Sequence, residues 1–329
     1  MRSRALVLIL TALTLFALAL PFLVGGNRFL AFVLGMTLIS VLWSSGMNLL
    51  YGFVGLMPLM FGGIAGIAAY TMVYLTQTQG WSFWLATPAA ALLSATIGVV
   101  LGLPSLRLRG FYFALCSLVI QSVITLAFIY FSQFTNGDVG ITQIPPPDWF
   151  SGERLRGLQF DFLLALVAVL GVAVTVIISQ SRLGKRLVAI REDDILAATL
   201  GINVLRDRSI AFFIVSIYAA LGGCLYATYV GFISPRAFDV LLSLNVWLFV
   251  AFGGRGTIVG PVLGALILAP LPFLLQELQA FKDVISGVLI IVVTLIMPAG
   301  IYGEFLRRKK RWASVAQTAT GSTPSPAKQ

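Results

Sequence analysis

Residues 181–235 read SRLGKRLVAIREDDILAATLGINVLRDRSIAFFIVSIYAALGGCLYATYVGFISP. The part from Arg182 to Arg208 is the one long charged interruption in an otherwise apolar chain. The part that follows, residues 210–231, is an apolar run long enough to form a helix that crosses a bilayer. Such a helix would leave the charged part at one face of the membrane, so this stretch predicts a membrane protein with a polar loop between spans.

The composition of the whole chain agrees with this prediction. Of 329 residues, 59% are hydrophobic and only 10% are charged, and the mean hydropathy is +0.97, values far from those of soluble domains. The net charge of +10 does not indicate nucleic-acid binding, because the basic residues lie between apolar runs and not in a stripe interleaved with aromatic residues. We therefore predict an all-α polytopic membrane protein that is surrounded by lipid.

About ten transmembrane helices are predicted from the lengths of the apolar runs. Most runs hold roughly 20 residues, which at about 1.5 Å per residue matches a hydrocarbon core about 30 Å thick. The two runs between residues 240 and 275 are short and broken by glycine, which leaves open whether one of them is re-entrant. The runs are residues 5–24, 29–50, 53–76, 83–103, 111–131, 161–180, 210–231, 240–254, 257–275 and 284–302.

The basic residues set the orientation. If the N-terminus is inside and all ten runs cross, seventeen of the 22 lysines and arginines lie on the cytoplasmic side and five lie outside. This positive-inside asymmetry predicts cytoplasmic N- and C-termini, with loop 181–209 inside and loop 132–160 outside. Residues 1–311 form the predicted transmembrane domain, and the polar tail 312–329 is predicted to be disordered.

The first apolar run also matches a second pattern. Arg2 and Arg4, an apolar stretch and the sequence ALA at 17–19 resemble a cleavable secretory signal. The apolar run continues to Val24, which favours a retained helix. Removal of the segment would leave the orientation of the other spans unchanged.

Several kinds of machinery are missing from the sequence. The chain contains no histidine, and no apolar run carries a charged residue near its middle, whereas proton- and ion-coupled transporters depend on such groups. The segment 184–186, GKR, lacks both the leading glycine and the hydroxyl residue of a phosphate-binding loop. Cys116 and Cys224 have no neighbouring metal ligands. We therefore predict a protein that is not an enzyme and that holds no cofactor or metal itself.

Blocks along most of residues 45–303 carry a family resemblance. Together with 181–235, the chain contains LRGFYFAL at 108–115, TNGDVGI at 135–141, FGGRGTIVGPVLGA at 252–265 and MPAGIYG at 297–303. In these blocks and their order, the chain resembles the M-type membrane subunit of the Liv branched-chain amino acid ABC importers. It departs at 55–62, which reads GLMPLMFG where the family commonly has Gly-Gln-x-Ser-x-Gly-His-Ala.

The resemblance implies an ABC importer permease fold and one half of a membrane pore. It implies a second, H-type permease subunit, two cytoplasmic ATPase subunits that bind ATP and Mg, and an extracytoplasmic substrate-binding protein that delivers branched-chain or related amino acids. The departure at 55–62 removes polar groups, which keeps urea, short amides or another small solute open as cargo. Two other classes remain as alternatives, a stand-alone channel or facilitator and a scaffold that only recruits a cytoplasmic protein.

In the family, loop 181–209 would carry the coupling helix that docks on the ATPase. Two local structures fit: one helix from Ser181 through Leu200, or a shorter helix from Asp194 to Leu200. In both, adjacent alanines leave a low surface that a partner can approach. An amphipathic helix that rests on lipid headgroups is the alternative. The predicted docking residues are Asp193, Asp194, Ala197, Ala198, Gly201 and Asn203.

Two further groups of residues stand out within the spans. Glycines that recur every four residues form a bare helix face, which favours close helix packing and leaves a lining of the solute path as the alternative. Polar residues that could meet a solute are few, and each could equally hydrogen-bond a neighbouring helix. The glycines are Gly62, Gly66, Gly256, Gly260 and Gly264, and the polar residues are Asn48, Gln121 and Asn245.

Overall fold

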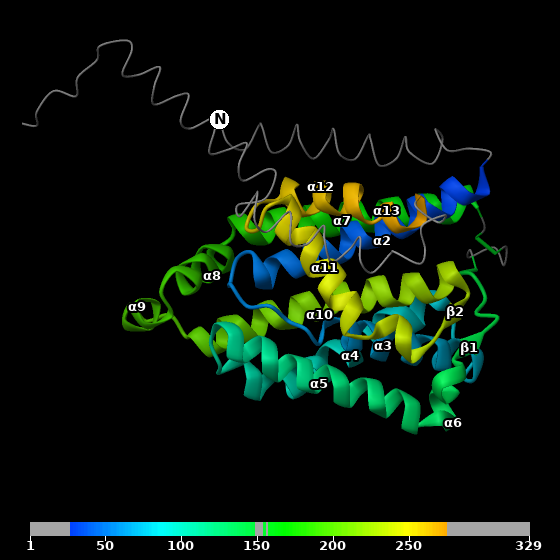
Figure 1. The fold of residues 1–329 in the computed structure, drawn as a ribbon, viewed down its shortest axis with the longest axis horizontal. Coiled ribbons are helices and arrows are strands. Elements are labelled where there is room, and N and C mark those ends of the chain that lie inside the picture. The colour runs from blue at the N-terminus through cyan, green and yellow to red at the C-terminus, as the bar shows by residue number, and fades with distance from the viewer. Residues whose placement is uncertain (1–26, 149–153, 156, 275–329) are drawn as a thin grey trace, which may run out of the picture.

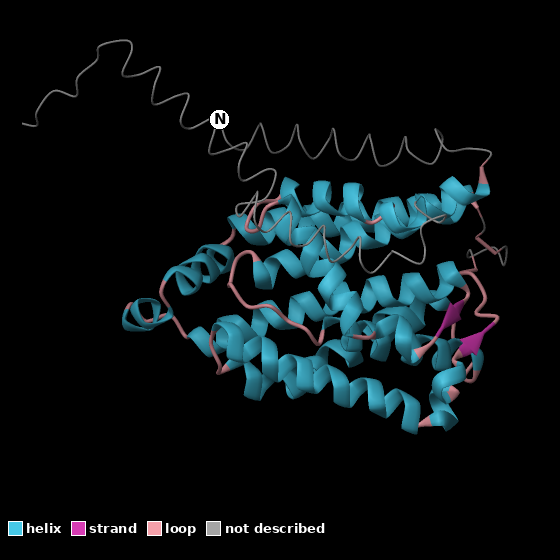
Figure 2. Ribbon diagram, viewed as in Figure 1, coloured by secondary structure: helices cyan, strands magenta, loops and turns pink. Residues whose placement is uncertain are grey.

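A computed structural model describes residues 27–148, 154–155 and 157–274 (Figure 1). The predicted runs 5–24 and 284–302 and the tail 312–329 lie outside the described residues. The described part is a bundle of helices with two very short strands at one end (Figure 2). Its all-α character agrees with the prediction.

The helices follow the apolar runs closely. Their bounds are α2 Arg28–Tyr51, α3 Phe61–Gln77, α4 Phe83–Leu106, α5 Gly110–Tyr130, α6 Ser132–Thr135, α7 Leu158–Gln180, α8 Arg182–Glu192, α9 Asp194–Thr199, α10 Val204–Val230, α11 Val240–Gly253, α12 Val259–Leu268 and α13 Leu271–Leu274. Two 3₁₀ turns, η1 Gly137–Val139 and η2 Pro235–Phe238, and the strands β1 Ile141–Thr142 and β2 Phe232–Ile233 complete the described part.

Among the described residues, six helices are long and apolar enough to cross a membrane. These are Arg28–Tyr51, Phe83–Leu106, Gly110–Tyr130, Leu158–Gln180, Val204–Val230 and Pro235–Gly253. They support a multi-pass membrane protein, while the full count of ten and the orientation of the termini stay predictions.

Run 53–76, predicted as one span, is only partly helical. Residues 52–60 form a turn and an extended segment, and α3 begins only at Phe61. Gly55 has a positive φ of 83°, and Pro58 lacks a backbone N–H for a helical bond. Two N–H groups in and just after this break are bound by side chains of other helices: Ser117 Oγ accepts from Leu59 N at 3.0 Å, and Ser243 Oγ accepts from Gly62 N at 2.9 Å.

The centre of the bundle is formed by α10, which packs against α2, α3 and α4. Small residues permit the close approach of α2 and α10, since a Cβ at Gly46 would lie 2.6 Å from Tyr218 Cγ. The indole Nε1 of Trp43 on α2 donates to the Ala219 carbonyl of α10 at 3.2 Å. This pair of helices therefore forms the fixed core.

The outer helices α4, α5 and α7 carry the exposed apolar side chains. Val100 on α4, Val119 on α5 and Ile177 on α7 are each more than half exposed. A surface of this kind suits lipid, which has no unfavourable contact with apolar groups.

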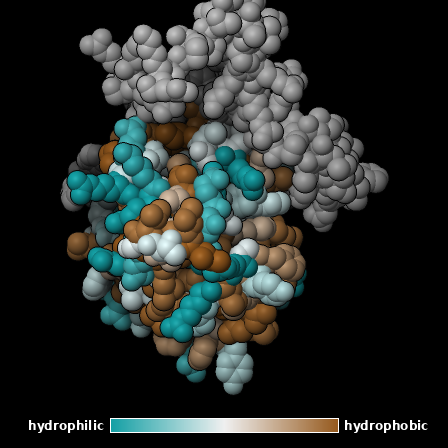
Figure 3. All heavy atoms as spheres, turned by 90° about the vertical axis from the view of Figure 1, so that its left-hand side faces the viewer, coloured by the Kyte–Doolittle hydropathy of each residue, from teal (hydrophilic) through white to brown (hydrophobic). Residues whose placement is uncertain are grey.

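The two ends of the bundle differ in structure. At one end, the short helices α8 and α9 project away from the spans (Figure 1). At the other end, β1 pairs antiparallel with β2, with Ile141 opposite Ile233. Figure 3 looks onto the first end, where hydrophilic side chains surround hydrophobic ones.

Candidate functional site

The charged loop 181–209 forms two short helices at the end of the bundle. The hydroxyl of Ser181 accepts from Gly184 N at 3.2 Å and begins α8. Leu187 and Ile190 turn the apolar face of α8 inward, and both are buried. Helix α8 thus lies as an amphipathic helix against the ends of the spans.

Asp193 and Gly201 define the start and the end of α9. Asp193 Oδ1 accepts from Ile195 N at 2.9 Å and from Leu196 N at 3.0 Å, which caps the helix. Gly201 has a φ of +84° and ends it, with Ile202 N donating to the Ala197 carbonyl at 3.1 Å, as in a Schellman motif. The single helix from 181 to 200 is therefore wrong, and the shorter helix is the one present, because the backbone of Asp193 is extended.

Helix α9 exposes a small apolar surface. Ile195 is 60% exposed, Leu196 57% and Leu200 74%. Ala198 is also exposed, but Ala197 is buried. The predicted low surface of two alanines is thus corrected to a face in which larger apolar side chains stand beside one exposed alanine.

Asn203 begins the next helix. Its side-chain oxygen accepts from Arg206 N at 3.0 Å and caps α10. The turn between α9 and α10 is therefore set by Gly201 and Asn203, which lie only two residues apart.

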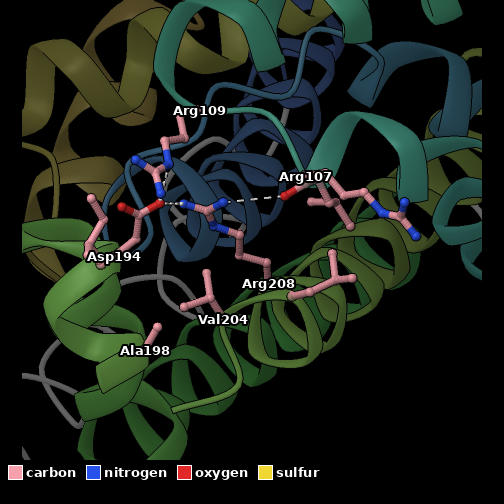
Figure 4. Close-up of a pocket in the computed structure, with 9 residues that line it drawn as sticks. Arg107, Arg109, Asp194, Ala198, Val204 and Arg208 are labelled. Carbon is pink, nitrogen blue, oxygen red and sulfur yellow. Dashed lines mark hydrogen bonds and ion pairs between the residues drawn. The ribbon is translucent and has the colours of Figure 1, made fainter. Parts of the chain in front are cut away.

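Ion pairs on one carboxylate tie α9 to the bundle. Oδ2 of Asp194 accepts from the buried Arg208 Nη2 at 3.1 Å and lies 2.8 Å from Nε of Arg109, whose side chain is exposed (Figure 4). The Arg208 side chain is only 7% exposed, and its Nη1 donates to the Leu106 carbonyl at 3.3 Å. One carboxylate thus joins α9 to the start of α10 and to the turn between α4 and α5.

A second ion pair ties α8 to α10. Arg186 Nε lies 2.8 Å from Asp207 Oδ2, and the Asp207 side chain is 5% exposed. Removal of one partner of such a pair leaves an uncompensated buried charge, which is far more costly than the loss of an exposed pair. Helices α8, α9 and the start of α10 are therefore held together as one unit.

Arg191 extends this unit to the ends of other spans. Its Nη1 donates to the Gly52 carbonyl, just after α2, at 2.6 Å, and its Nη2 lies 2.7 Å from Glu192 Oε1. The hydrogen bond and charge of Arg191 lower the pKa of Glu192, and the charge of Arg255 adds to this effect. A Cβ at Gly256 would lie 2.8 Å from Arg191 Nη1, so the guanidinium also touches the break between α11 and α12.

A family model for the permease component of branched-chain amino acid transport systems matches residues 29–294. The chain belongs to this family. The LivM permease protein of Escherichia coli K12 is 32% identical to this permease over an alignment of 317 positions, which covers 89% of this chain and 74% of the relative.

Two more distant relatives carry related names. The LivH permease protein of Salmonella typhimurium is 29% identical over an alignment of 188 positions, which covers 54% of this chain and 61% of the relative. A probable LivM protein of Methanocaldococcus jannaschii is 26% identical over an alignment of 235 positions, which covers 67% of this chain and 68% of the relative. No solved structure matches the permease. The relatives are named as transport permeases, so the permease is a transport subunit and not an enzyme.

Two of the predicted polar residues bridge broken helices of the permease. Asn48 Nδ2 donates to the Thr257 carbonyl at 2.7 Å, and Asn48 Oδ1 accepts from Gly256 N at 2.9 Å. Gln121 Oε1 accepts from Gly63 N at 2.6 Å, and its Nε2 donates to the Phe238 carbonyl at 2.8 Å. Both side chains therefore form hydrogen bonds with backbone N–H and carbonyl groups at positions where helices begin or are interrupted. Asn245, in contrast, is exposed on α11.

The predicted glycines lie where backbone segments approach closely. A Cβ at Gly66 would lie 2.7 Å from Phe128 Cε2, and one at Gly62 would lie 2.7 Å from the Asp239 carbonyl oxygen. A Cβ at Gly260 would lie 2.5 Å from the Gly254 oxygen, and Gly264 lies against the Phe249 carbonyl of α11. These contacts favour the packing role over the lining of a path.

Sequence reasoning missed the partners of Asp194. Arg109 and Arg208 are separated from it by many residues, and no spacing rule links them. One signal was available, since Arg208 and Asp207 stand at the edge of an apolar run, where buried charges need partners. Ser243, whose Oγ accepts from Gly62 N at 2.9 Å, carried no such signal.

Proposed function

We propose that this permease is the M-type subunit of an ATP-driven ABC importer and that α9 is the helix through which it docks on a cytoplasmic ATPase. The observation that carries the proposal is the apolar face of α9, which projects beyond the spans while the buried ion pair of Asp194 with Arg208 anchors its base. A surface that only rested on lipid headgroups would need no such anchor to α10 and to the α4–α5 turn.

Movement of α9 would reach the spans along two routes. Asp194 connects it to Arg208 at the start of α10, the central helix. Arg191 connects the preceding helix α8 to Gly52 at the end of α2 and to Gly256 at the α11–α12 break. The routes end at α10 and α2, which form the core, and at the α11–α12 break, so an ATPase that opens and closes would move the ends of several spans together.

The proposed partners follow from the family. A second, H-type permease would complete the pore, since the related LivM and LivH proteins carry names of one transport system. Two ATPase subunits would hold ATP and Mg, and an extracytoplasmic binding protein would deliver cargo to loop 132–160. We place the complex in a bacterial inner membrane, with about ten spans, both termini and loop 181–209 cytoplasmic, transmembrane domain 1–311 and a disordered tail 312–329.

The proposed cargo is a branched-chain or related hydrophobic amino acid, as in the name of the LivM relative. The departure from the family at 55–62 bears on this choice. Leu56, Met60 and Phe61 are buried at 2% exposure or less, so they contribute to packing at the start of α3. The loss of polar groups there therefore argues less strongly for a different solute, and urea or short amides form the alternative.

Docking is tested with Gly201→Glu in the complex reconstituted with its ATPases. Gly201 has a φ of +84° and open space around its Cα, so the substitution adds strain and a carboxylate beside the docking face without a clash inside the subunit. We expect normal insertion, ATP hydrolysis without coupled uptake, and the same result for Ala198→Trp.

Gly80→Glu is the matched control, because Gly80 also has a positive φ, of 67°, and open space, but lies between α3 and α4. It should keep uptake. Unchanged uptake in both α9 variants would refute the docking role. Solute flux through the purified single chain would instead support a stand-alone channel.

A further inference from the structure

A hollow of about 380 Å³ lies between α9, the start of α10 and the turn that joins α4 to α5 (Figure 4). Ile195 and Ala198 of α9 form one wall. Arg107, Arg109 and Arg208 approach from the other elements. The hollow thus combines an apolar wall with a basic rim.

The charges around this hollow are not balanced by its own residues. Three arginines are among its lining residues, although the guanidinium of Arg107 points away from Asp194 (Figure 4), and Asp194 is the one carboxylate among these residues. One oxygen of Asp194 already pairs with both Arg109 and Arg208. A guanidinium has five N–H donors, so donors exceed acceptors here by a wide margin.

Two arginines keep unused donors. Nε of Arg208 is buried and has no hydrogen-bond partner among the described residues, although the side chain is 7% exposed. Arg107 forms no ion pair within the part of the chain that the structure describes. A buried donor without an acceptor is costly, so a group that brought an acceptor to Arg208 Nε would stabilise this hollow.

We propose that the hollow receives an acidic side chain, an aspartate or glutamate, of the ATPase that docks on α9. The proposal rests on the proposed function and names the chemistry of its partner. A carboxylate is planar and matches the fork geometry of arginine. Ile195 and Ala198 belong both to the wall of the hollow and to the exposed surface of α9, so one partner would reach both.

The position of the hollow favours a protein over an anionic lipid headgroup. Helix α9 projects beyond the ends of α4, α5 and α10 (Figure 1), so its wall of the hollow stands outside the level of the spans. A docking protein that covers α9 would also exclude water from the rim, which strengthens an ion pair. Arg107 and Arg109 would then act as a second contact beside the coupling helix.

A carbodiimide cross-link tests the occupant directly in the assembled complex. Arg107→Lys puts an amine at the rim, and carbodiimide joins an amine to a carboxylate that it contacts. We expect a permease–ATPase product above the wild-type background, with a peptide joined through aspartate or glutamate. Arg206→Lys is the control, since Arg206 is exposed on α10 near the hollow but does not line it, and it should give only background.

Charge reversal provides the second test. Arg107→Glu should lower the amount of ATPase that co-purifies by roughly fivefold or more, because it replaces an attraction with a repulsion, whereas Arg206→Glu should stay near wild type. Arg107 has no ion pair to lose within the described residues, so folding is expected to be unaffected. The measurement is made in vesicles of phosphatidylcholine alone and in vesicles that also contain phosphatidylglycerol.

The outcomes separate the alternatives. A cross-linked carboxylate together with a reversal effect in both vesicles supports the proposal. If the wild-type complex is intact but the Arg107→Lys variant gives no cross-linked product above background, the proposal is overturned. It is also overturned if Arg107→Glu lowers co-purification only in vesicles that contain phosphatidylglycerol, which would assign the hollow to lipid. A wild-type chain that never co-purifies with an ATPase would contradict the proposed function itself.

Discussion

The two ends of the bundle are held together by different kinds of contact. At the α8–α9 end, the contacts between elements are side-chain ion pairs whose carboxylates, Asp194 and Asp207, are largely buried. At the opposite end, β1 pairs with β2, and Ile144 N donates to the Gly231 carbonyl at 3.2 Å. The α8–α9 end is thus held by side-chain contacts, whereas the opposite end is held by backbone hydrogen bonds that fix the register of the two strands.

The ion pairs of the opposite end are also of a different kind. Arg236 and Asp138 meet at 3.3 Å, but their side chains are 84% and 55% exposed. Such pairs contribute little, because water screens both charges. The comparison teaches that the same residue types are structural at one end and nearly dispensable at the other, and that burial decides which.

Asp194→Ala is expected to have the largest effect on stability, and it tests whether the buried ion pairs distinguish the two ends. The substitution leaves the buried guanidinium of Arg208 without its carboxylate, which should cost about 3 kcal/mol. Thermal unfolding of the purified protein in detergent should show a clearly lower midpoint, and coupled uptake should be lost.

Asp138→Ala is the matched control at the opposite end, where an exposed pair should cost less than about 1 kcal/mol. Equal midpoints for the two variants would show that the burial of the ion pairs does not distinguish the ends.

A smaller effect is expected for Arg191→Met, which tests whether the α8–α9 end passes movement on to the spans through Arg191. The variant loses a charged hydrogen bond to Gly52, an interaction of about 1.5–3 kcal/mol. We expect coupled uptake to fall by about tenfold while stimulated ATP hydrolysis persists, since α9 itself is unchanged.

The control on the same helix is Arg182→Met, because Arg182 is exposed and forms no ion pair among the described residues. If both variants transport alike, Arg191 is not a link between α8 and the spans.

Much of the fold could be predicted from hydropathy alone. Run 29–50 became α2, Arg28–Tyr51, because length and apolar content decide where a membrane helix lies. The break at 52–60 was only partly predictable, since Pro58 disfavours a continuous helix there but hydropathy gives no sign of a break in a segment that stays apolar. Its backbone is satisfied by side chains such as Ser117, and such distant contacts leave no pattern in the sequence.

The candidate site was predictable in its local parts only. Asp193 and Gly201 act within a few residues of their own positions, as a cap and a left-handed turn, so sequence rules identified these roles. Asn203 was predicted as a docking residue, and its role as the cap of α10 is seen only in the structure. Ala197 was expected at the surface, and its burial follows from how α9 lies on the bundle. That orientation depends on Asp194 meeting Arg208, which no local rule describes.

The smallest expected effect is that of a glycine substitution at the charged end, Gly201→Ala, and its counterpart at the opposite end is Gly140→Ala. Gly140 has a φ of +78°, and a Cβ there would overlap the Ile233 carbonyl oxygen, beside the strand pair. Gly201 has a φ of +84° and no atom within 4 Å of an added Cβ. Both alanine variants carry the left-handed strain of about 1–2 kcal/mol, but only Gly140→Ala must also displace backbone that the β1–β2 ladder holds.

We therefore expect Gly201→Ala to lower stability by about 1 kcal/mol, and Gly140→Ala to lower it by more. The unfolding midpoints of the two variants in detergent provide the measurement, with Gly80→Ala as a strain-only reference in open space. If Gly140→Ala matched this reference, the backbone at the β1–β2 end would yield as readily as the open turn after α9. The expected contrast between the two ends would then fail. It requires the β1–β2 ladder to resist a displacement of its backbone, whereas an added Cβ at Gly201 lies in open space.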